Sequence, residues 1–501
     1  MRTRTIVIGL VAVVILAGLA IVFLPQLLKP NQPSLPSYWP TQGWQESTPE
    51  EQGMDSAKLA EALQAFQDRN IHIDSLLIIR NGSVILDAYF YPYDGTTAHD
   101  FASVTKSVMT TLIGIASGQG KIQLDQPMLS YFPERTIANR DERKERITVR
   151  NLAGMVNGLE SGCLAGDQPT IQKMMSNPDW VQAALDRKMV QEPGTAFCYD
   201  SPGMHLLSAI LQNATGMTAL EFARQNLFEP LGVEEAIWDS DPQGFTRGWG
   251  DLHLKPRDAA KIGYLFLHQG VWEGKQIVPA EWVEEAVKSQ TKTGGDDDYG
   301  YGWWISEMSS GAQGRGGQRI FFVPSLNAIV VTTGSGFEYD EIDPYIQAAV
   351  VDTEKPLPAK PEGVAMLEAA ITASAQAPAP QPVGPLPDTA QAISGKTYVL
   401  APNSAGVETV SLEFNDRAEA ILHIIITGYG ESLSWPIGLD GVYRTLPDGS
   451  RRRGAWIDPQ TFVFEVVDVE TVTYRVHFDG NNVVIESPEL GIRLEGQQEN
   501  P

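Results

Sequence analysis

Two patterns of hydrophobic and polar positions divide the chain. Between residues 55 and 332, apolar residues recur mainly at the three- and four-residue spacing of helices. From residue 393 onward, short runs of alternating apolar and polar residues follow one another, separated by turns such as Asp479-Gly480. The first pattern predicts a domain of helices and strands. The second predicts a small all-β domain, either a sandwich or a barrel.

Strand patterns open and close the first region. Residues 75–80 and 83–90 are apolar runs joined by Asn81-Gly82, a pair that favours a tight hairpin turn. Residues 320–324 and 328–332 form a second such pair. We therefore expect an α+β domain whose antiparallel sheet is flanked by helices and joins both ends of the region. The helical patterns lie at residues 55–68, 104–116, 203–213, 218–227, 257–268 and 281–289.

An apolar segment without charged residues occupies residues 5–24. Its length suits one crossing of a bilayer. Arg2 and Arg4 precede it, so the positive-inside bias places residues 1–4 in the cytoplasm and the following domains outside. A cleaved signal peptide is the alternative, but it has a shorter apolar core and a clear small-x-small site. We favour an uncleaved single-pass anchor in the cell membrane.

Composition shifts mark the remaining boundaries. Five prolines between residues 25 and 44 are typical of an extended stalk. Residues 353–390 are rich in Pro and Ala, as linkers are, with a short helical pattern at 364–373. The predicted organisation is a cytoplasmic tail (1–4), a transmembrane anchor (5–24), a stalk (25–44), an α+β domain (45–352), a linker (353–390) and a β-domain (391–501).

Charge and histidine content exclude some classes of partner. The chain has 501 residues and a formal net charge of −25, which argues against nucleic acid because phosphate binding requires basic patches. The seven histidines show no metal-ligand spacing, so we expect neither a metal nor another cofactor. The oligomeric state stays open.

The only two cysteines are Cys163 and Cys198. Outside the cytoplasm a disulfide is permitted, and this pair would close a loop of modest length. Two separate buried thiols are the alternative. We expect the disulfide because Cys198 lies next to one of the chemical motifs described below.

Ser103 and Lys106 stand at the start of the helical pattern at 104–116. Three residues is just under one turn, so both side chains point to one face. A serine hydroxyl becomes a useful nucleophile when a base takes its proton, and a neutral amine beside it can do so. The helix start also favours developing negative charge. The alternative is a capping serine and a surface lysine.

Two further motifs carry polar groups toward a possible cleft. Tyr199 and Ser201 precede the helical pattern at 203–213, although a buried tyrosine with a capping serine would give the same sequence. Arg315-Gly316-Gly317-Gln318 runs into an apolar strand. Glycines allow close approach of a backbone, and a strand-edge N–H can face an oxyanion. A glycine-rich hairpin loop is the alternative there.

Taken in this order and at these separations, the three motifs resemble those of the penicillin-recognising serine hydrolases. The similarity is nearest to class C β-lactamases, D-aminopeptidases and carboxypeptidases, and their esterase and 6-aminohexanoate-dimer hydrolase relatives. It covers about residues 45–350. Further segments that resemble the family are residues 152–159, 227–232 and 254–260.

The resemblance implies a β-lactamase/transpeptidase-like fold and assigns roles to the catalytic groups. Ser103 would be the acylated nucleophile, and Lys106 would take its proton. Tyr199 would be a second base, or would shuttle the proton toward the leaving group. The backbone N–H groups of Ser103 and Gln318 would form the oxyanion hole.

The same resemblance assigns substrate-binding roles to four residues at which the chain departs from the family pattern. Ser201 stands where many members have Asn, and Arg315 stands where others have Lys or His. Arg315-Gly316-Gly317 replaces the usual Lys-Thr-Gly. Arginine keeps the positive charge and can hold a carboxylate, but it cannot act as a base. These departures favour the esterase and amidase branch.

The predicted function is hydrolysis of an ester, amide or lactam through an acyl-enzyme on Ser103. The partners would be a small-molecule or peptide-like substrate and the membrane. The alternative is a penicillin-binding sensor or a cell-wall binding module that acylates without turnover.

Overall fold

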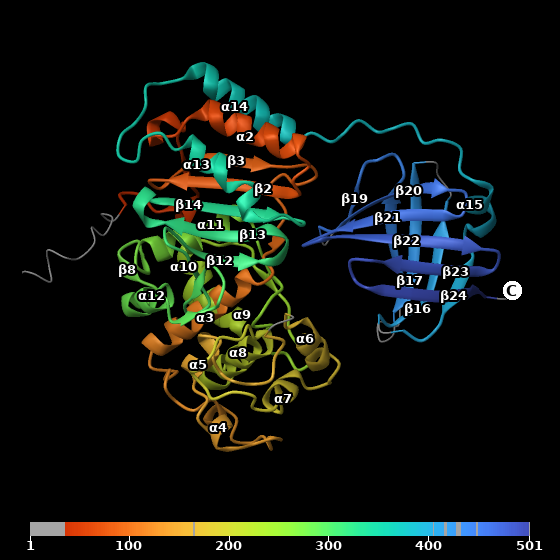
Figure 1. Ribbon diagram of the computed structural model, residues 1–501. Coiled ribbons are helices and arrows are strands. Elements are labelled where there is room, and N and C mark those ends of the chain that lie inside the picture. The colour runs from red at the N-terminus through yellow and green to blue at the C-terminus, as the bar shows by residue number, and fades with distance from the viewer. Residues whose placement is uncertain are drawn as a thin grey trace, which may run out of the picture. The chain divides into compact units, whose positions relative to one another are not determined.

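A nine-stranded sheet organises the α+β domain of the computed structural model (Figure 1). The structure describes residues 36–499 except 164–165, 404, 415–417, 427–431 and 447–448. All neighbouring strands are antiparallel apart from β1 and β3. In sheet order the strands are β1 (Gln45–Glu46), β3 (Ser83–Tyr89), β2 (Ile73–Arg80), β14 (Ala328–Gly334), β13 (Gln318–Val323), β12 (Ser310–Gly314), β11 (Trp304–Ile305), β10 (Asp298–Tyr299) and β9 (Thr291–Lys292).

The two predicted hairpins form the centre of this sheet. Asn81 and Gly82 turn β2 into β3 with φ values of 50° and 81°, the left-handed region that Asn and Gly tolerate. β2 pairs with β14, so the sheet joins segments from both ends of the domain as expected. The predicted α+β class is confirmed.

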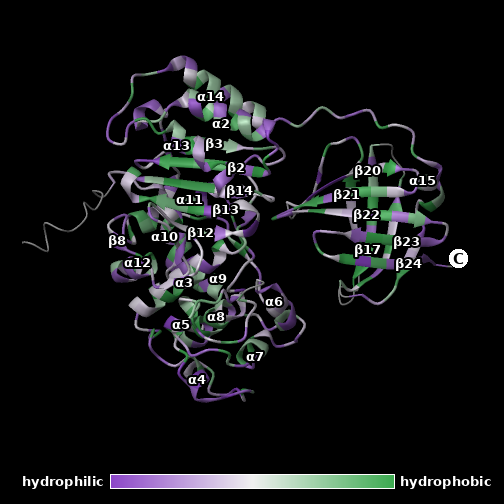
Figure 2. Cartoon of the chain, in the orientation of Figure 1, coloured by the Kyte–Doolittle hydropathy of each residue, from purple (hydrophilic) through white to green (hydrophobic). Residues whose placement is uncertain are grey.

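Alternating residues of β2 belong to two separate cores. Leu76 and Ile78 are buried in one cluster with Leu63 and Phe66 of helix α2 (Ser56–Asp68). Leu77 and Ile79 are buried in the larger cluster on the opposite face. Because successive side chains of a strand point to opposite faces, a continuous apolar strand places helices on both sides of the sheet. Figure 2 shows the central strands as hydrophobic ribbons.

Helices α13 (Asp343–Ala349) and α14 (Pro361–Ser374) pack against α2. Figure 1 shows α14 beside α2. The short helix expected at 364–373 within the linker is thus present as part of α14, and it buries Leu367 in the core around α2. Alanine is the strongest helix former, so a Pro- and Ala-rich composition also fits a helix that starts at a proline.

Helices α3 (Val104–Gly118), α8 (Ser201–Thr215) and α11 (Pro256–Leu267) build the larger core. α3 packs against α8, and α11 packs on β13 and β14. Residues 104–116 of α3 are all buried, as expected for a central helix. The other elements of this domain are α4 (Glu142–Glu145), α5 (Val149–Ala153), α6 (Gln168–Met175), α7 (Trp180–Leu185), α9 (Ala219–Ala223), α10 (Glu229–Leu231), α12 (Ala280–Ala286), β4 (His99–Asp100), β5 (Ile237–Trp238), β6 (Leu252–Leu254), β7 (Val271–Trp272) and β8 (Lys275–Gln276).

The C-terminal domain is a barrel. Ten strands follow one another as neighbours, and an additional pairing of β18 with β20 closes the sheet. A short helix, α15 (Asp388–Ile393), precedes it. The strands are β15 (Thr397–Leu400), β16 (Val407–Glu413), β17 (Glu419–Ile426), β18 (Ser432–Gly438), β19 (Arg444–Thr445), β20 (Arg451–Asp458), β21 (Thr461–Val467), β22 (Thr471–Asp479), β23 (Asn482–Ser487) and β24 (Ile492–Gln498).

Residues 39–501 cluster as one compact unit, so the barrel and the α+β domain share contacts within it. Among the described residues, no helix combines the length and the apolar character that a membrane span requires. The segment at residues 5–24 lies outside the described residues, and the membrane anchor stays a prediction.

Candidate active site

Ser103 lies at the start of α3 with its hydroxyl free of any capping role. It is the N-cap residue of the helix, yet its side chain forms no capping hydrogen bond. The preceding Ala102 has a φ of 47°, and its N–H donates to Oδ1 of Asp100 at 2.7 Å. A non-glycine residue in the left-handed region is uncommon and marks a turn held by its surroundings. The sharp turn presents Ser103 at the end of the helix.

Lys106 is the residue that contacts this hydroxyl. Its Nζ lies 2.8 Å from Oγ of Ser103 and 2.8 Å from the carbonyl oxygen of Trp249. The side chain is 1% exposed, so it is not a surface lysine. No ion pair of Lys106 is found in the described part of the chain. The two groups that the sequence places on one helix face are thus in hydrogen-bonding contact.

The ring of Tyr199 lies next to Lys106. The Nζ atom is 4.8 Å from the centroid of the tyrosine ring. The ring stacks on Trp304 of β11 with centroids 6.1 Å apart and planes inclined by 23°. Trp304 also contacts Phe197 and Tyr299 edge-on. Aromatic contacts therefore fix the plane of the ring next to the serine–lysine pair.

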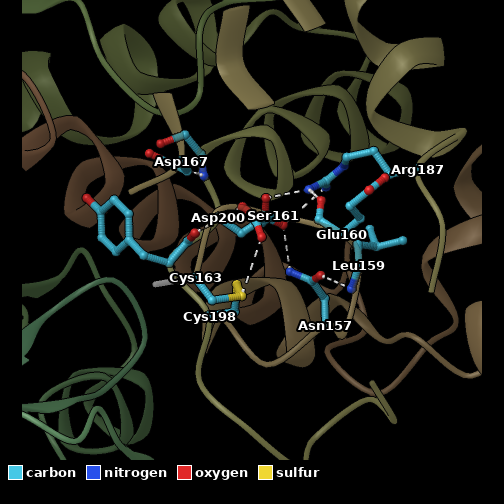
Figure 3. The surroundings of a disulfide bond; sticks show 11 residues. Asn157, Leu159, Glu160, Ser161, Cys163, Asp167, Arg187, Cys198 and Asp200 are labelled. Carbon is cyan, nitrogen blue, oxygen red and sulfur yellow. Dashed lines mark hydrogen bonds and ion pairs between the residues drawn. A yellow bond between two sulfur atoms is a disulfide. The ribbon is translucent and has the colours of Figure 1, made fainter. Parts of the chain in front are cut away.

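A disulfide holds the segment that carries Tyr199. Cys163 and Cys198 are joined with their Cα atoms 4.8 Å apart, which gives the pairing that their spacing predicts. The N–H of Cys198 donates to the carbonyl of Met155, and Oγ of Ser161 donates to the carbonyl of Tyr199 at 3.2 Å. Figure 3 shows the disulfide beside Ser161 and Asp200. The backbone on both sides of Tyr199 is tied to the loop after α5.

A buried ion pair fixes the residue after Tyr199. The guanidinium of Arg187 donates to both carboxylate oxygens of Asp200, at 2.5 and 3.1 Å (Figure 3). Nδ2 of Asn157 adds a third donor to Asp200 at 2.8 Å. The side chains of Arg187 and Asp200 are 6% and 1% exposed. A bidentate, desolvated pair of this kind restrains the carboxylate strongly.

The sequence motifs do not mark Arg187 and Asp200 as functional residues. Asn157 falls in the stretch that resembles the family, but nothing near Arg187 in the sequence marks a buried cation. Ser201, predicted to bind substrate, is 1% exposed, and its N–H donates to Oδ2 of Asp167 at 2.6 Å. Its backbone thus helps to start α8 behind Tyr199.

The glycine-rich loop between β12 and β13 lies against the start of α3. A Cβ added at Gly314 would lie 2.6 Å from the carbonyl oxygen of Phe101 and 3.1 Å from the backbone nitrogen of Ser103. Gly316 and Gly317 have φ values of 79° and 103°, which non-glycine residues rarely adopt. The structure therefore brings the predicted edge next to the predicted nucleophile.

Gln318 is locked at the first position of β13. Its amide donates to the carbonyl of Gly334 at 2.6 Å and accepts from the Gly334 N–H at 3.2 Å. The residue is fully buried. Because the Gln318 side chain is hydrogen-bonded to β14, only the backbone of Gln318 could bind a substrate. This suits the oxyanion-hole role implied by the resemblance.

Arg315 points instead to the barrel. Its Nη1 lies 2.7 Å from Oε2 of Glu470, and both side chains are about half exposed, at 51% and 48%. In the described part of the chain, no group of three or more His, Cys, Asp or Glu residues is placed to hold a metal ion.

Comparison with known proteins fits this geometry. The model of the Beta-lactamase family matches residues 57–353, more than half of the chain. A 6-aminohexanoate-dimer hydrolase of Paenarthrobacter ureafaciens is 23% identical over 309 residues, which span 52% of this chain and 72% of that protein. Protein flp of Staphylococcus aureus (strain MW2) is 26% identical over 172 residues, which span 33% of this chain and 34% of that protein.

A solved structure supports the fold. The structure of EstCE1, described as a hydrolase with promiscuous acyltransferase activity, superposes with a TM-score of 0.50 at 17% identity. The match covers 59% of this chain and 99% of that one. At this identity the likeness concerns the fold of the α+β domain.

Proposed function

The chain belongs to the Beta-lactamase family of serine hydrolases, and from this premise we propose that it cleaves an ester or amide through an acyl-enzyme on Ser103. One observation carries the proposal. The buried Nζ of Lys106 lies 2.8 Å from an uncapped Ser103 hydroxyl. Hydrogen-bond contact between nucleophile and base is the geometric signature of an activated serine.

The proposed reaction has two steps. Oγ of Ser103 attacks the substrate carbonyl, and its proton passes to the Lys106 amine. The oxyanion that forms accepts hydrogen bonds from the backbone N–H groups of Ser103 and Gln318. Tyr199 passes the proton to the leaving group as the carbonyl–leaving-group bond breaks. Water then attacks the acyl-enzyme, the same groups accept its proton, and the free acid and Ser103 are released.

The proposal favours the ester and amide branch. The edge loop carries Arg315-Gly316-Gly317 rather than the Lys-Thr-Gly of lactam-recognising members. The relative from Paenarthrobacter is named for an amide-cleaving activity, and EstCE1 is described as a hydrolase with acyltransferase activity. The arginine can hold an acidic group but cannot take up a proton.

The experiment uses purified protein with p-nitrophenyl esters, the 6-aminohexanoate dimer, nitrocefin and a fluorophosphonate label. We expect labelling and ester or amide turnover in the wild type and neither in Ser103→Ala. Ser117→Ala, a partly exposed serine on the same helix, is the matched control and should behave as wild type. Absence of labelling in folded wild-type protein would contradict the proposal. A burst of one product per chain without steady turnover would favour the acylating sensor.

The proposed location is the outer face of the cell membrane, with residues 5–24 as the anchor. The uncharged apolar run and the two preceding arginines support it. Carbonate extraction of membranes, followed by protease treatment of intact cells, tests it. The full chain should stay in the membrane pellet and lose its α+β domain to the protease, and a soluble chain would contradict the anchor.

A further inference from the structure

The turn between barrel strands β21 and β22 is seated on the edge of the candidate site. The backbone N–H and the hydroxyl of Thr471 both donate to the carbonyl of Ser335, each at 3.0 Å. Val469 lies at the tip of this turn, where side chains are usually exposed, yet it is only 4% exposed. A buried hairpin tip with hydrogen bonds at its base is a docked contact.

The tip contacts the glycine loop that carries the substrate-binding edge. A Cβ added at Gly316 would lie 1.8 Å from the carbonyl oxygen of Val469, so a side chain there would clash with the turn. Two residues further along the loop is Gln318, whose backbone N–H the proposed mechanism places in the oxyanion hole. The next residue of the turn, Glu470, forms the ion pair with Arg315 at 2.7 Å.

A second anchor fixes the barrel in this position. Arg451 of β20 is 3% exposed, and its Nη2 lies 3.3 Å from Oδ1 of Asp74 on β2. The same guanidinium lies 3.9 Å from the centroid of the Tyr93 ring. The Arg451 cation is thus desolvated between an acidic and an aromatic partner, and moving it away from either would be costly. The contact therefore restrains the barrel, and with it the orientation of the turn.

We propose that this turn, residues 468–471, forms one wall of the substrate pocket and that Glu470 is a specificity-determining residue that disfavours substrates with a carboxylate near the scissile carbonyl. The inference rests on the proposed function. Arg315 is the cation that the edge loop offers to such a carboxylate, and Glu470 already neutralises it. A second carboxylate on the same guanidinium would meet like-charge repulsion at close range. The preferred acyl group is therefore uncharged.

The test compares two esters on the full-length protein: p-nitrophenyl pentanoate, and the mono-p-nitrophenyl ester of glutaric acid, which carries a carboxylate in place of the terminal methyl group. In Glu470→Gln we expect kcat/KM for the charged ester to rise about fivefold to tenfold at low ionic strength, and less at high salt. The neutral ester should change less than about twofold. Arg315→Gln combined with Glu470→Gln should lose the gain, because the cation is gone.

Glu489→Gln, an exposed acid of the same barrel, is the matched control and should leave the ratio of the two esters unchanged. Equal gains for both esters would overturn the proposal, because the turn would then be a general barrier. An unchanged ratio in Glu470→Gln would also overturn it. Wild-type turnover of the neutral ester, lost in Ser103→Ala, establishes the hydrolase independently of either result. If no ester is turned over and Ser103 is not labelled, the proposed function fails and this inference fails with it.

Discussion

The two halves of the candidate site are held in different ways. The inner half, Ser103, Lys106 and Tyr199, is joined by short side-chain contacts within the α+β domain and is backed by a disulfide and a buried ion pair. The outer half, Arg315, Gly316 and Gly317, depends on backbone shape and on a half-exposed ion pair with the barrel. In the proposed mechanism the inner half contains the groups that react, and the outer half contains groups that bind the substrate. We therefore expect changes in the inner half to abolish activity and changes in the outer half to alter preference.

The largest expected effect is from Lys106→Met, which keeps the length of the side chain and removes the base. We expect kcat/KM for any ester to fall by about 10³-fold or more, because Ser103 then has no group to take its proton. Steady-state hydrolysis measures the loss, and circular dichroism verifies the fold.

Lys144→Met is the matched control for Lys106→Met. Lys144 is also fully buried, and its Nζ donates to the carbonyls of Ala138, Leu185 and Arg187. Its loss should lower the melting temperature and leave kcat per folded molecule nearly unchanged. If the two variants lost activity equally, Lys106 would be a structural lysine.

Asp200→Asn removes one partner of the buried ion pair behind Tyr199. We expect the free energy of unfolding to fall by about 3–5 kcal/mol, because Arg187 is left buried without a counter-charge. Urea denaturation measures this change. The kcat for a neutral ester, measured on the folded fraction, should also fall because the backbone next to Tyr199 loosens. Wild-type stability in the variant would show that the pair does not support the inner half.

Cys163→Ser removes the disulfide that closes a sequence separation of 35 residues. The expected loss of unfolding free energy is about 4 kcal/mol, mainly from the greater freedom of the unfolded chain. Thermal unfolding with and without reductant measures the change, and the variant should be insensitive to reductant. A wild-type protein whose melting temperature does not respond to reductant would contradict this role.

Asp74→Asn tests the anchor that seats the barrel. Burial raises the pKa of Asp74 to about 6, against the opposing effect of Arg451. Among the described residues, Oδ2 of Asp74 finds no hydrogen-bond partner. The folded wild type therefore binds a proton between pH 4 and 6 that the unfolded chain releases, so its stability falls as pH rises through this window.

The asparagine variant lacks this titration. Relative to wild type, the free energy of unfolding of the variant should therefore rise by about 3 kcal/mol between pH 4 and pH 7. Urea denaturation at both pH values measures it. A difference that is the same at the two pH values would show that Asp74 does not titrate in the folded state with a raised pKa.

Local patterns predicted much of the fold. Asn81-Gly82 identified the hairpin that begins the central sheet, and the apolar stripe after Ser103 identified the buried helix α3. The pattern at 364–373 predicted the helix α14 within the linker, but nothing local showed that this helix packs on α2 and buries Leu367. The closing pair of the barrel, β18 with β20, leaves no local sign in the sequence.

The site was predictable where its groups lie close together in the chain or in recognisable motifs. Ser103 and Lys106 are three residues apart, so helix geometry alone brings them together. The fold brings Arg187 and Asp200 together, and no local sequence pattern marks either residue as part of a buried ion pair. Arg315 and Glu470 are separated by 155 residues and belong to different domains, so their pairing follows only from the docking of the barrel.

The three residues at the tip of the barrel turn lie outside the hydrogen-bonded ladder. The ladder of β21 and β22 ends at the pair Val467 and Thr471, so no strand register constrains residues 468–470. Val469 is buried against the glycine loop, whereas Glu470 is about half exposed. A change at Glu470 therefore leaves the paired strands of the barrel and the helix that carries Ser103 in place, which makes this one position the natural place to introduce a new substrate preference.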